Sequence, residues 1–344
     1  MRQFFTILFA AVLLAGCAKV SDITTINGTF AENPPEAVLL SIPDMEIEQM
    51  VEVTDGAFSV EVPTDNTLVG TIVAGMSTVE FVPDGTVLTI DFGQTATVVT
   101  SDKPRISTQV KYDKFVQGVE AILAKEDVLS SDELEKQAIS YFMDAIKANP
   151  DNAIGMTALS SIYYMIPADQ LEMALGWLGD NLKEKEEVKE IVKSLDAKKL
   201  TGEGAMFTDF TVIQDPEKPE ESTVKFSDFI GNGKYMLVDF WASWCGPCIR
   251  ELPNIKAVYE TYAGDRFDIL SVAVWDKPED TVQAAIDLEI PWNQIINAQQ
   301  IPTDIYGIEG IPHIILFGPD GKILKRDLRG QMIAAEIAKY VSAN

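Results

Sequence analysis

The strongest hydrophobic pattern in the chain lies between residues 235 and 262. Residues 235–242 form an almost continuous apolar run that is interrupted only by Asp239. Such a run predicts a strand that is buried on both faces of an α/β sheet. A turn signal follows, and residues 249–262 then carry apolar side chains at helical spacing. The pattern therefore predicts a strand, a tight turn and a helix in immediate succession.

Residues 201–344 continue this alternation of strands and helices. Further strands are expected over residues 210–212, 267–274, 294–296, 311–317 and 322–326, and helices over residues 278–288, 301–306 and 331–342. Asp320-Gly321 is a hairpin turn signal between the last two strands. We therefore expect an α/β domain in which helices flank a mixed central sheet.

Residues 25–104 show short extended runs that are separated by turns. Strands are expected over residues 37–42, 47–53, 57–62, 68–74, 79–82 and 86–91. Asp55-Gly56 is typical of a β-hairpin, and Pro83-Asp84-Gly85 is a second turn signal. The regular spacing of these runs predicts an all-β sandwich or a small barrel. No cluster of chemically active residues occurs in this stretch, so we interpret it as a binding or spacer module.

Residues 105–200 change to helical spacing. Helices are expected over residues 112–123, 130–149, 152–165, 167–182 and 183–199. Ser130 and Glu133 match a capping box at the start of the second helix. The side chains that could line a binding groove are interpreted as core because of their helical spacing: Tyr163, Tyr164, Met165 and Trp177.

Residues 1–16 have the anatomy of a secretory signal peptide, with a basic start, an apolar core and small residues at the end. The ending Leu-Ala-Gly-Cys resembles the bacterial lipobox. This resemblance implies that Cys17 becomes the lipidated first residue of a periplasm-facing lipoprotein, on either the inner or the outer membrane. In the alternative, residues 1–16 are an ordinary export signal and Cys17 is incidental. Residues 17–24 are expected to form a tether.

The charge balance excludes one class of partner. The chain has 53 acidic and 27 basic residues, and its formal net charge is −26. Such a chain repels phosphate backbones, so we expect no nucleic-acid partner.

The segment Cys245-Gly246-Pro247-Cys248 carries the candidate chemistry. A helix start lowers the pKa of a thiol through its free N–H groups and its dipole. We therefore expect Cys245 to be an exposed nucleophile with a lowered pKa, and Cys248 to be the more buried, resolving thiol. A zinc site is disfavoured because His313 is the only histidine, and no cofactor is expected.

Two motifs carry a resemblance to a known family. VDFWASWCGPC, residues 238–248, is very similar to the active-site segment of thioredoxins, and YGIEGIPHIILF, residues 306–317, resembles their second signature loop. Details at residues 209–211, 227–229 and 279–296 resemble the TlpA/ResA-type, envelope-anchored branch. The layout as a whole resembles Bacteroidetes lipoproteins in which a small β domain precedes a thioredoxin-like domain.

The resemblance implies roles for residues around the dicysteine. Pro312 would be a cis-proline, and the backbone of Ile311 would pair with an extended substrate. Asp239 would be the buried acid that takes the proton from Cys248, although it could instead reach solvent at the strand end. Glu251 would border the site or be a solvated helix residue. The remaining residues assigned to substrate contact are Trp244, Gly246 and Pro247.

These observations predict a membrane-tethered thiol–disulfide oxidoreductase that reduces protein disulfides. The family implies recharging by a membrane electron donor of the DsbD type. An oxidant or isomerase remains open, as does a partner-binding lipoprotein in which residues 25–200 capture the partner. A thiol peroxidase is disfavoured because the Thr and Pro of the peroxidase motif are replaced by Ala242 and Val238.

Overall fold

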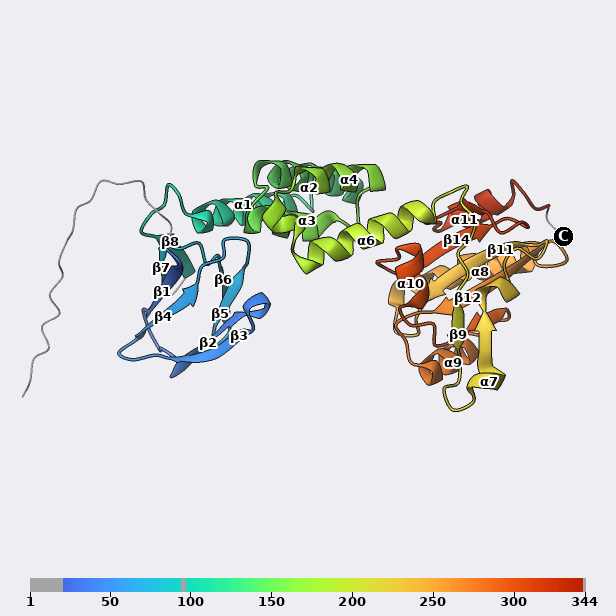
Figure 1. Ribbon diagram of the computed structural model, residues 1–344, viewed down its shortest axis with the longest axis horizontal. Coiled ribbons are helices and arrows are strands. Elements are labelled where there is room, and N and C mark those ends of the chain that lie inside the picture. The colour runs from blue at the N-terminus through green and yellow to red at the C-terminus, as the bar shows by residue number, and fades with distance from the viewer. Residues whose placement is uncertain (1–20, 94–96, 343–344) are drawn as a thin grey trace, which may run out of the picture. The chain divides into compact units, whose positions relative to one another are not determined.

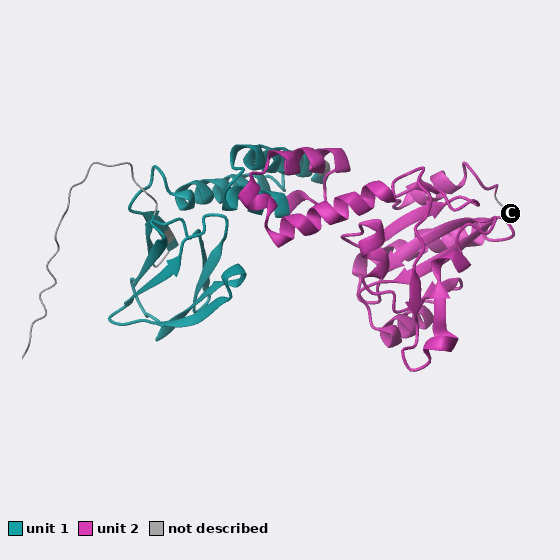
Figure 2. Cartoon of the chain, in the orientation of Figure 1, with its two compact units in different colours: residues 1–160 teal, residues 161–344 magenta. Residues whose placement is uncertain are grey.

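The computed structural model describes residues 21–93 and 97–342 (Figure 1). The predicted signal peptide and Cys17 lie outside the described residues. The chain divides into two compact units, residues 1–160 and residues 161–344 (Figure 2). This division cuts through the predicted helical segment, and the boundaries of the predicted domains stay a prediction. Among the described residues, no helix is both long and apolar enough to cross a membrane.

The described strands of the first unit form two four-stranded sheets, with orders β4-β1-β7-β8 and β3-β2-β5-β6. Alternate side chains of both sheets share one core, which includes Ile26, Leu40 and Ile90. The predicted sandwich is therefore confirmed. The strands are β1 (Ile23–Phe30), β2 (Ala37–Ile42), β3 (Ile47–Glu52), β4 (Ala57–Pro63), β5 (Gly70–Ala74), β6 (Ser77–Phe81), β7 (Val87–Phe92) and β8 (Thr97–Ser101).

Three expectations for this region need correction. Strand β1 begins within the predicted tether, and neither β1 nor β8 was expected from the sequence. Asp55-Gly56 does form a turn with positive φ at both residues, 54° and 75°. The strands that it joins, however, belong to different sheets, because β3 pairs with β2 and β4 pairs with β1. The expected two-residue hairpin turn is thus present, closed by an antiparallel bridge between Thr54 and Ala57, but it carries the chain from one layer to the other.

The helical segment follows the predicted spacing. The capping box of α2 is present, with the Ser130 side chain accepting from Glu133 N–H and the Glu133 side chain accepting from Ser130 N–H. The interpretation of Tyr164 and Met165 as core is wrong, because they are 57% and 39% exposed. The helices are α1 (Thr108–Leu123), α2 (Ser131–Ala148), α3 (Ala153–Ile162), α4 (Ala168–Trp177), α5 (Asp180–Lys183) and α6 (Glu186–Leu200).

The C-terminal part of the second unit is built on a five-stranded mixed sheet with the order β13-β12-β11-β14-β15. Strand β11 is central and is parallel to β12 but antiparallel to β14. Its strands are β11 (Tyr235–Trp241), β12 (Phe267–Ala273), β13 (Asn293–Ile295), β14 (His313–Phe317) and β15 (Ile323–Lys325), and a separate hairpin pairs β9 (Thr211–Ile213) with β10 (Thr223–Lys225).

Both faces of this sheet are covered. Leu237 and Ile314 pack with residues of α8 and α11 on one face. Val238 and Phe240 pack with Phe226 and the β9–β10 hairpin on the other. The expected mixed sheet between covering elements is therefore confirmed. Its helices are α7 (Pro219–Ser222), α8 (Gly246–Tyr262), α9 (Pro278–Asp287), α10 (Ile301–Tyr306) and α11 (Gln331–Ile337).

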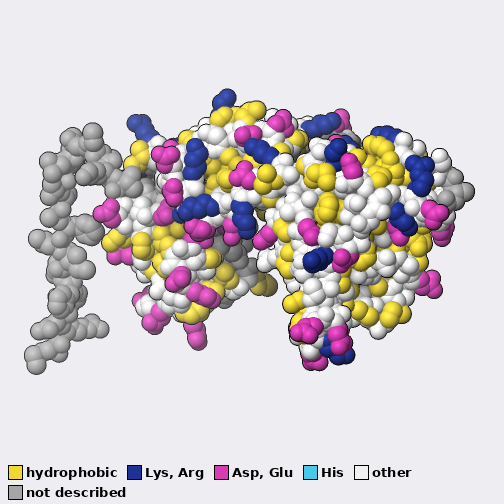
Figure 3. Space-filling view, turned by 45° about the vertical axis from the view of Figure 1, so that its right-hand side comes forward, with side chains coloured by type: hydrophobic (Ala, Val, Ile, Leu, Met, Phe, Trp, Pro, Cys, Tyr) yellow, Lys and Arg dark blue, Asp and Glu magenta, His cyan; other side chains and the backbone are white. Residues whose placement is uncertain are grey.

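Charged side chains of both signs are visible on the face of the molecule that Figure 3 draws. On the face drawn in Figure 3, acidic and basic side chains are interspersed with hydrophobic ones, and the described residues of that face form no broad basic area.

Candidate active site

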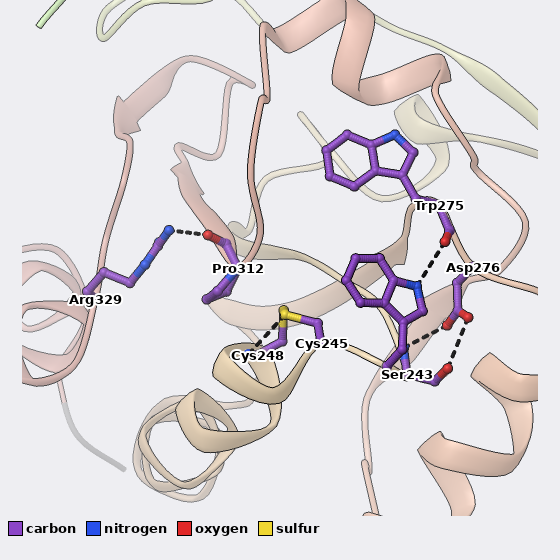
Figure 4. Close-up of a disulfide and its surroundings, with 8 residues drawn as sticks. Ser243, Cys245, Cys248, Trp275, Asp276, Pro312 and Arg329 are labelled. Carbon is purple, nitrogen blue, oxygen red and sulfur yellow. Dashed lines mark hydrogen bonds between the residues drawn. A yellow bond between two sulfur atoms is a disulfide. The ribbon is translucent and has the colours of Figure 1, made fainter. Parts of the chain in front are cut away.

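The dicysteine lies where the central strand β11 gives way to helix α8. Cys245 is the N-cap of α8, and it forms a disulfide with Cys248, with a Cα–Cα distance of 5.3 Å (Figure 4). The backbone N–H of Cys248 points at Cys245 Sγ at 3.1 Å. The same N–H and the helix dipole would stabilise a thiolate on Cys245 in the reduced protein. The strand, turn and helix were all predicted from the hydrophobic pattern.

The expected exposure of Cys245 is wrong for this oxidised form. Cys245 is 3% exposed and Cys248 is 2% exposed, so both sulfurs are buried. The cause is local packing, because Trp241, Ala242 and Ile311 enclose the pair. A substrate must therefore bind to the surface that adjoins the buried disulfide.

The loop at residues 311–312 comes from a distant part of the chain and lies beside the disulfide. The Ile311–Pro312 peptide bond is cis, as the resemblance implied. Figure 4 shows Pro312 beside Cys245 and Cys248. Arg329 Nη2 donates a hydrogen bond to the Pro312 carbonyl. Arg329 therefore holds the loop from its far side.

Asp239 lies inside the sheet and does not reach solvent. It is 1% exposed, and its Oδ1 has no hydrogen-bond partner among the described residues. The pKa of Asp239 is raised to about 7, chiefly by burial; the Arg329 charge and a hydrogen bond from Ser271 oppose this rise, and the Glu251 charge adds to it. A carboxyl group with such a pKa can accept and return a proton near neutral pH.

Three other predicted site residues, Glu251, Gly246 and Pro247, belong to helix α8. Glu251 Oε1 accepts from the Gly330 N–H at 2.9 Å and from Asn254 Nδ2 at 2.7 Å, so it fixes the start of α11. Its predicted place at the border of the site is supported only by its effect on the pKa of Asp239. Gly246 and Pro247 form the first turn of α8, and Pro247 is exposed.

His313 lies on the sheet face opposite Asp239, since it pairs in register with Phe240 and contacts that ring. Its Nδ1 lies 2.9 Å from Asp327 Oδ1, and its Nε2 lies 3.2 Å from Arg326 Nη2. Burial lowers the pKa of His313, although Asp327 opposes this shift. The imidazole is therefore a structural group of the far face.

Asp276 was missed by the sequence analysis. Its carboxylate accepts from Ser243 N–H at 2.7 Å, from Ser243 Oγ at 2.9 Å and from Thr281 Oγ1 at 2.8 Å. It therefore fixes the turn just before Cys245 (Figure 4). One signal was available, because Asp276 follows β12 and the carboxyl ends of neighbouring parallel strands meet at one edge of a sheet.

Trp275 and Trp244 form an aromatic surface next to this turn. Trp244 is 62% exposed, and its Nε1 donates to the Trp275 carbonyl at 3.0 Å. Trp275 has a φ of 54°, an uncommon value for a bulky residue. The predicted contact surface at Trp244 thus has a second indole beside it that the sequence analysis did not include.

Comparison with known proteins agrees with this geometry. Residues 204–326 match the AhpC/TSA family. The chain is 32% identical over 131 residues to the thiol-disulfide oxidoreductase ResA of Oceanobacillus iheyensis, covering 37% of this chain and 66% of that protein. The C-terminal domain belongs to the thioredoxin-like thiol–disulfide oxidoreductases. The ResA of Geobacillus thermodenitrificans is 27% identical, with 41% of this chain and 76% of that protein covered.

The oxidoreductase domain is also similar to a solved structure. The thioredoxin domain of a thiol-disulfide oxidoreductase from Bacteroides vulgatus is 32% identical, and the match covers 41% of this chain and 99% of that chain with a TM-score of 0.36. The chain spans slightly less than two thirds of the Oceanobacillus relative. The residues at the two peroxidase motif positions, Val238 and Ala242, are buried and apolar.

Proposed function

We propose that the protein is a membrane-anchored reductant of protein disulfides in the cell envelope. The observation that carries the proposal is the placement of the Cys245–Cys248 pair at the N-terminus of α8, beside a cis-proline. The ResA relatives support thiol–disulfide exchange as the chemistry. The lipobox-like ending at Cys17 supports the membrane anchor.

The reaction begins with the reduced dithiol. The Cys245 thiolate attacks one sulfur of the substrate disulfide, which forms a mixed disulfide and releases the first substrate thiolate. Cys248 then gives its proton to Asp239 and attacks Cys245 Sγ. The second substrate thiolate leaves, and the protein is left with the Cys245–Cys248 disulfide. Two electrons have passed to the substrate, and the oxidised pair is the form seen in the structure.

A membrane electron donor of the DsbD type would return two electrons to the oxidised pair. The proposed substrate contacts are the indole of Trp244, the turn at Gly246 and Pro247, and the backbone of Ile311. In the described part of the chain, no hydrogen bond engages the main chain of Ile311. An extended substrate segment could therefore pair with it as an added strand.

Reduction of insulin by the purified chain tests the chemistry. Cys245→Ser should abolish activity, because a serine at this position can form neither the mixed disulfide with the substrate nor the disulfide with Cys248. Activity that survives this substitution would contradict the proposal. The same preparation allows the reduction potential to be measured. A reductant should lie near the thioredoxin value of about −270 mV, whereas a value near the DsbA value of about −120 mV would favour the oxidant alternative.

A further inference from the structure

A groove of about 720 Å³ opens beside the cis-proline loop within the second unit. One wall includes Ile311 and Pro312, whose other neighbours are the two cysteines. A second wall includes residues 164–168, which are the end of the α3–α4 connection and the first residue of α4. The helical segment thus contributes a surface next to the redox site.

This second wall is fixed to the thioredoxin-like domain through α6. Gly307 approaches α6 so closely that a Cβ there would lie 2.5 Å from the Ser194 carbonyl oxygen. Lys198 Nζ lies 2.7 Å from Glu309 Oε2, with both side chains mostly buried. Arg326 Nη1 donates to the Thr201 carbonyl at 2.8 Å. These contacts hold α6, and α4 packs on α6 in turn.

The charged groups of the groove are already engaged within the chain. Each has an internal partner: Lys198 pairs with Glu309, Glu203 with Lys325, Asp327 with His313, Arg326 with the Thr201 and Tyr306 carbonyls, and Arg329 with the Pro312 carbonyl. A ligand that required one of the cationic groups would have to compete with an existing contact, whereas Glu309 Oε1 is buried without a hydrogen-bond partner among the described residues and can accept an N–H from a ligand. The groove therefore favours apolar side chains and main-chain donors over acidic groups.

Tyr164 and Met165 supply such contacts. They are 57% and 39% exposed, and both face the groove that contains Ile311. Tyrosine and methionine are suited to binding surfaces, because each offers a large apolar area and methionine adapts its shape to different partners. The free main chain of Ile311 would hold an extended segment in register beside them.

We propose that Tyr164 and Met165 form the second wall of the substrate groove, and that this groove takes an extended segment with apolar side chains next to its disulfide-bonded cysteine. The inference rests on the proposed function and specifies its substrate class. It also gives the helical segment a role in substrate choice.

The test is a single-turnover reaction of the pre-reduced chain, carrying Cys17→Ser, with three disulfides. Two are short peptide disulfides that differ only in leucine or aspartate beside the cysteine, and the third is hydroxyethyl disulfide. The unaltered site should react about tenfold faster with the leucine peptide than with the aspartate peptide, since one apolar contact in a pocket is worth about that factor. Tyr164→Ala with Met165→Ala should remove this preference and leave hydroxyethyl disulfide unaffected.

A matched control replaces Met173 and Val192 by alanine. These residues are 51% and 40% exposed on α4 and α6 and do not line the groove, so the preference should persist. An unchanged leucine preference in the Tyr164/Met165 variant overturns the inference, and so does an equal loss with hydroxyethyl disulfide. Failure of the unaltered chain to reduce any of the three disulfides would instead overturn the proposed function.

Discussion

At the scale of single residues, Arg329 interacts both with the buried carboxyl group of Asp239 and with the loop beside the disulfide. Arg329 binds the Pro312 carbonyl and lowers the pKa of Asp239, which burial raises. The roles of Cys245 and Cys248 were predicted from their place at a helix start, and that of Asp239 from the resemblance to thioredoxins. Arg329 could not be predicted, because its contact with Pro312 spans 17 residues and depends on how two loops fold onto one sheet edge.

Asp239 should make folding stability depend on pH. Its pKa rises from 3.8 to about 7 on folding, so the folded chain binds more protons within that window. The free energy of unfolding should therefore fall as pH rises from about 4 to about 7, by up to about 4 kcal/mol. Urea unfolding of the wild type and Asp239→Asn over this range measures the effect. The variant should lose this decrease, and parallel curves would contradict the assignment.

Arg329→Gln should raise the pKa of Asp239 further, because it removes a nearby positive charge. It should also loosen the loop at Pro312. We expect the pH profile of mixed-disulfide resolution to move to higher pH and the rate to fall on the order of tenfold. Stopped-flow rates as a function of pH measure both. A fall in rate with an unshifted pH profile would show that Arg329 acts through loop structure alone.

At the scale of elements, the sequence predicted most strands and helices but not all their partners. Strand β1 was missed, and it contains an Asn27-Gly28 pair, which is a turn signal rather than a strand signal. In the structure, Gly28 lies against the ring of Phe58, and a Cβ at Gly28 would lie 1.9 Å from a ring atom. The pairing of β3 and β4 with other strands was equally hidden, because local turn signals do not specify which sheet a strand joins.

The turn before Cys245 is held by Asp276, which follows strand β12 and lies 33 residues after Ser243 in the sequence. Asp276→Ala would leave the N–H and hydroxyl of Ser243 and the hydroxyl of Thr281 without their acceptor. We expect a loss of about 2–4 kcal/mol in the free energy of unfolding. Urea unfolding measures this loss, with the exposed Asp265→Ala as control. A loss no larger than that of the control would show that Asp276 does not hold the turn.

At the scale of the whole molecule, the chain combines a β sandwich, a helical segment and an oxidoreductase domain. The sequence predicted this order of fold classes from changes in periodicity. It did not predict that residues 164–168 would line a groove with Ile311, because helical spacing alone favoured a core position for Tyr164. Residues 164–168 of the helical segment therefore belong to the second unit and share a groove with Ile311.

Cys17→Ser should release the protein from the membrane. Lipidation would occur only on this cysteine, and no described helix could cross a membrane. Expression with residues 1–16 in a bacterium, followed by fractionation, should give the unaltered protein in membranes and the variant in the soluble envelope fraction. An unaltered protein that is soluble after removal of residues 1–16 would favour the ordinary export signal.

The central claim is that Cys245 attacks the substrate and Cys248 resolves the adduct. The most direct measurement is mass spectrometry of the mixed disulfides that form with disulfide-bonded insulin. It compares Cys248→Ala with Cys245→Ala, each in a Cys17→Ser background. The proposal predicts a stable adduct on Cys245 in Cys248→Ala and far less adduct in Cys245→Ala. Equal adducts in the two variants, or an adduct mainly on Cys248, would contradict it.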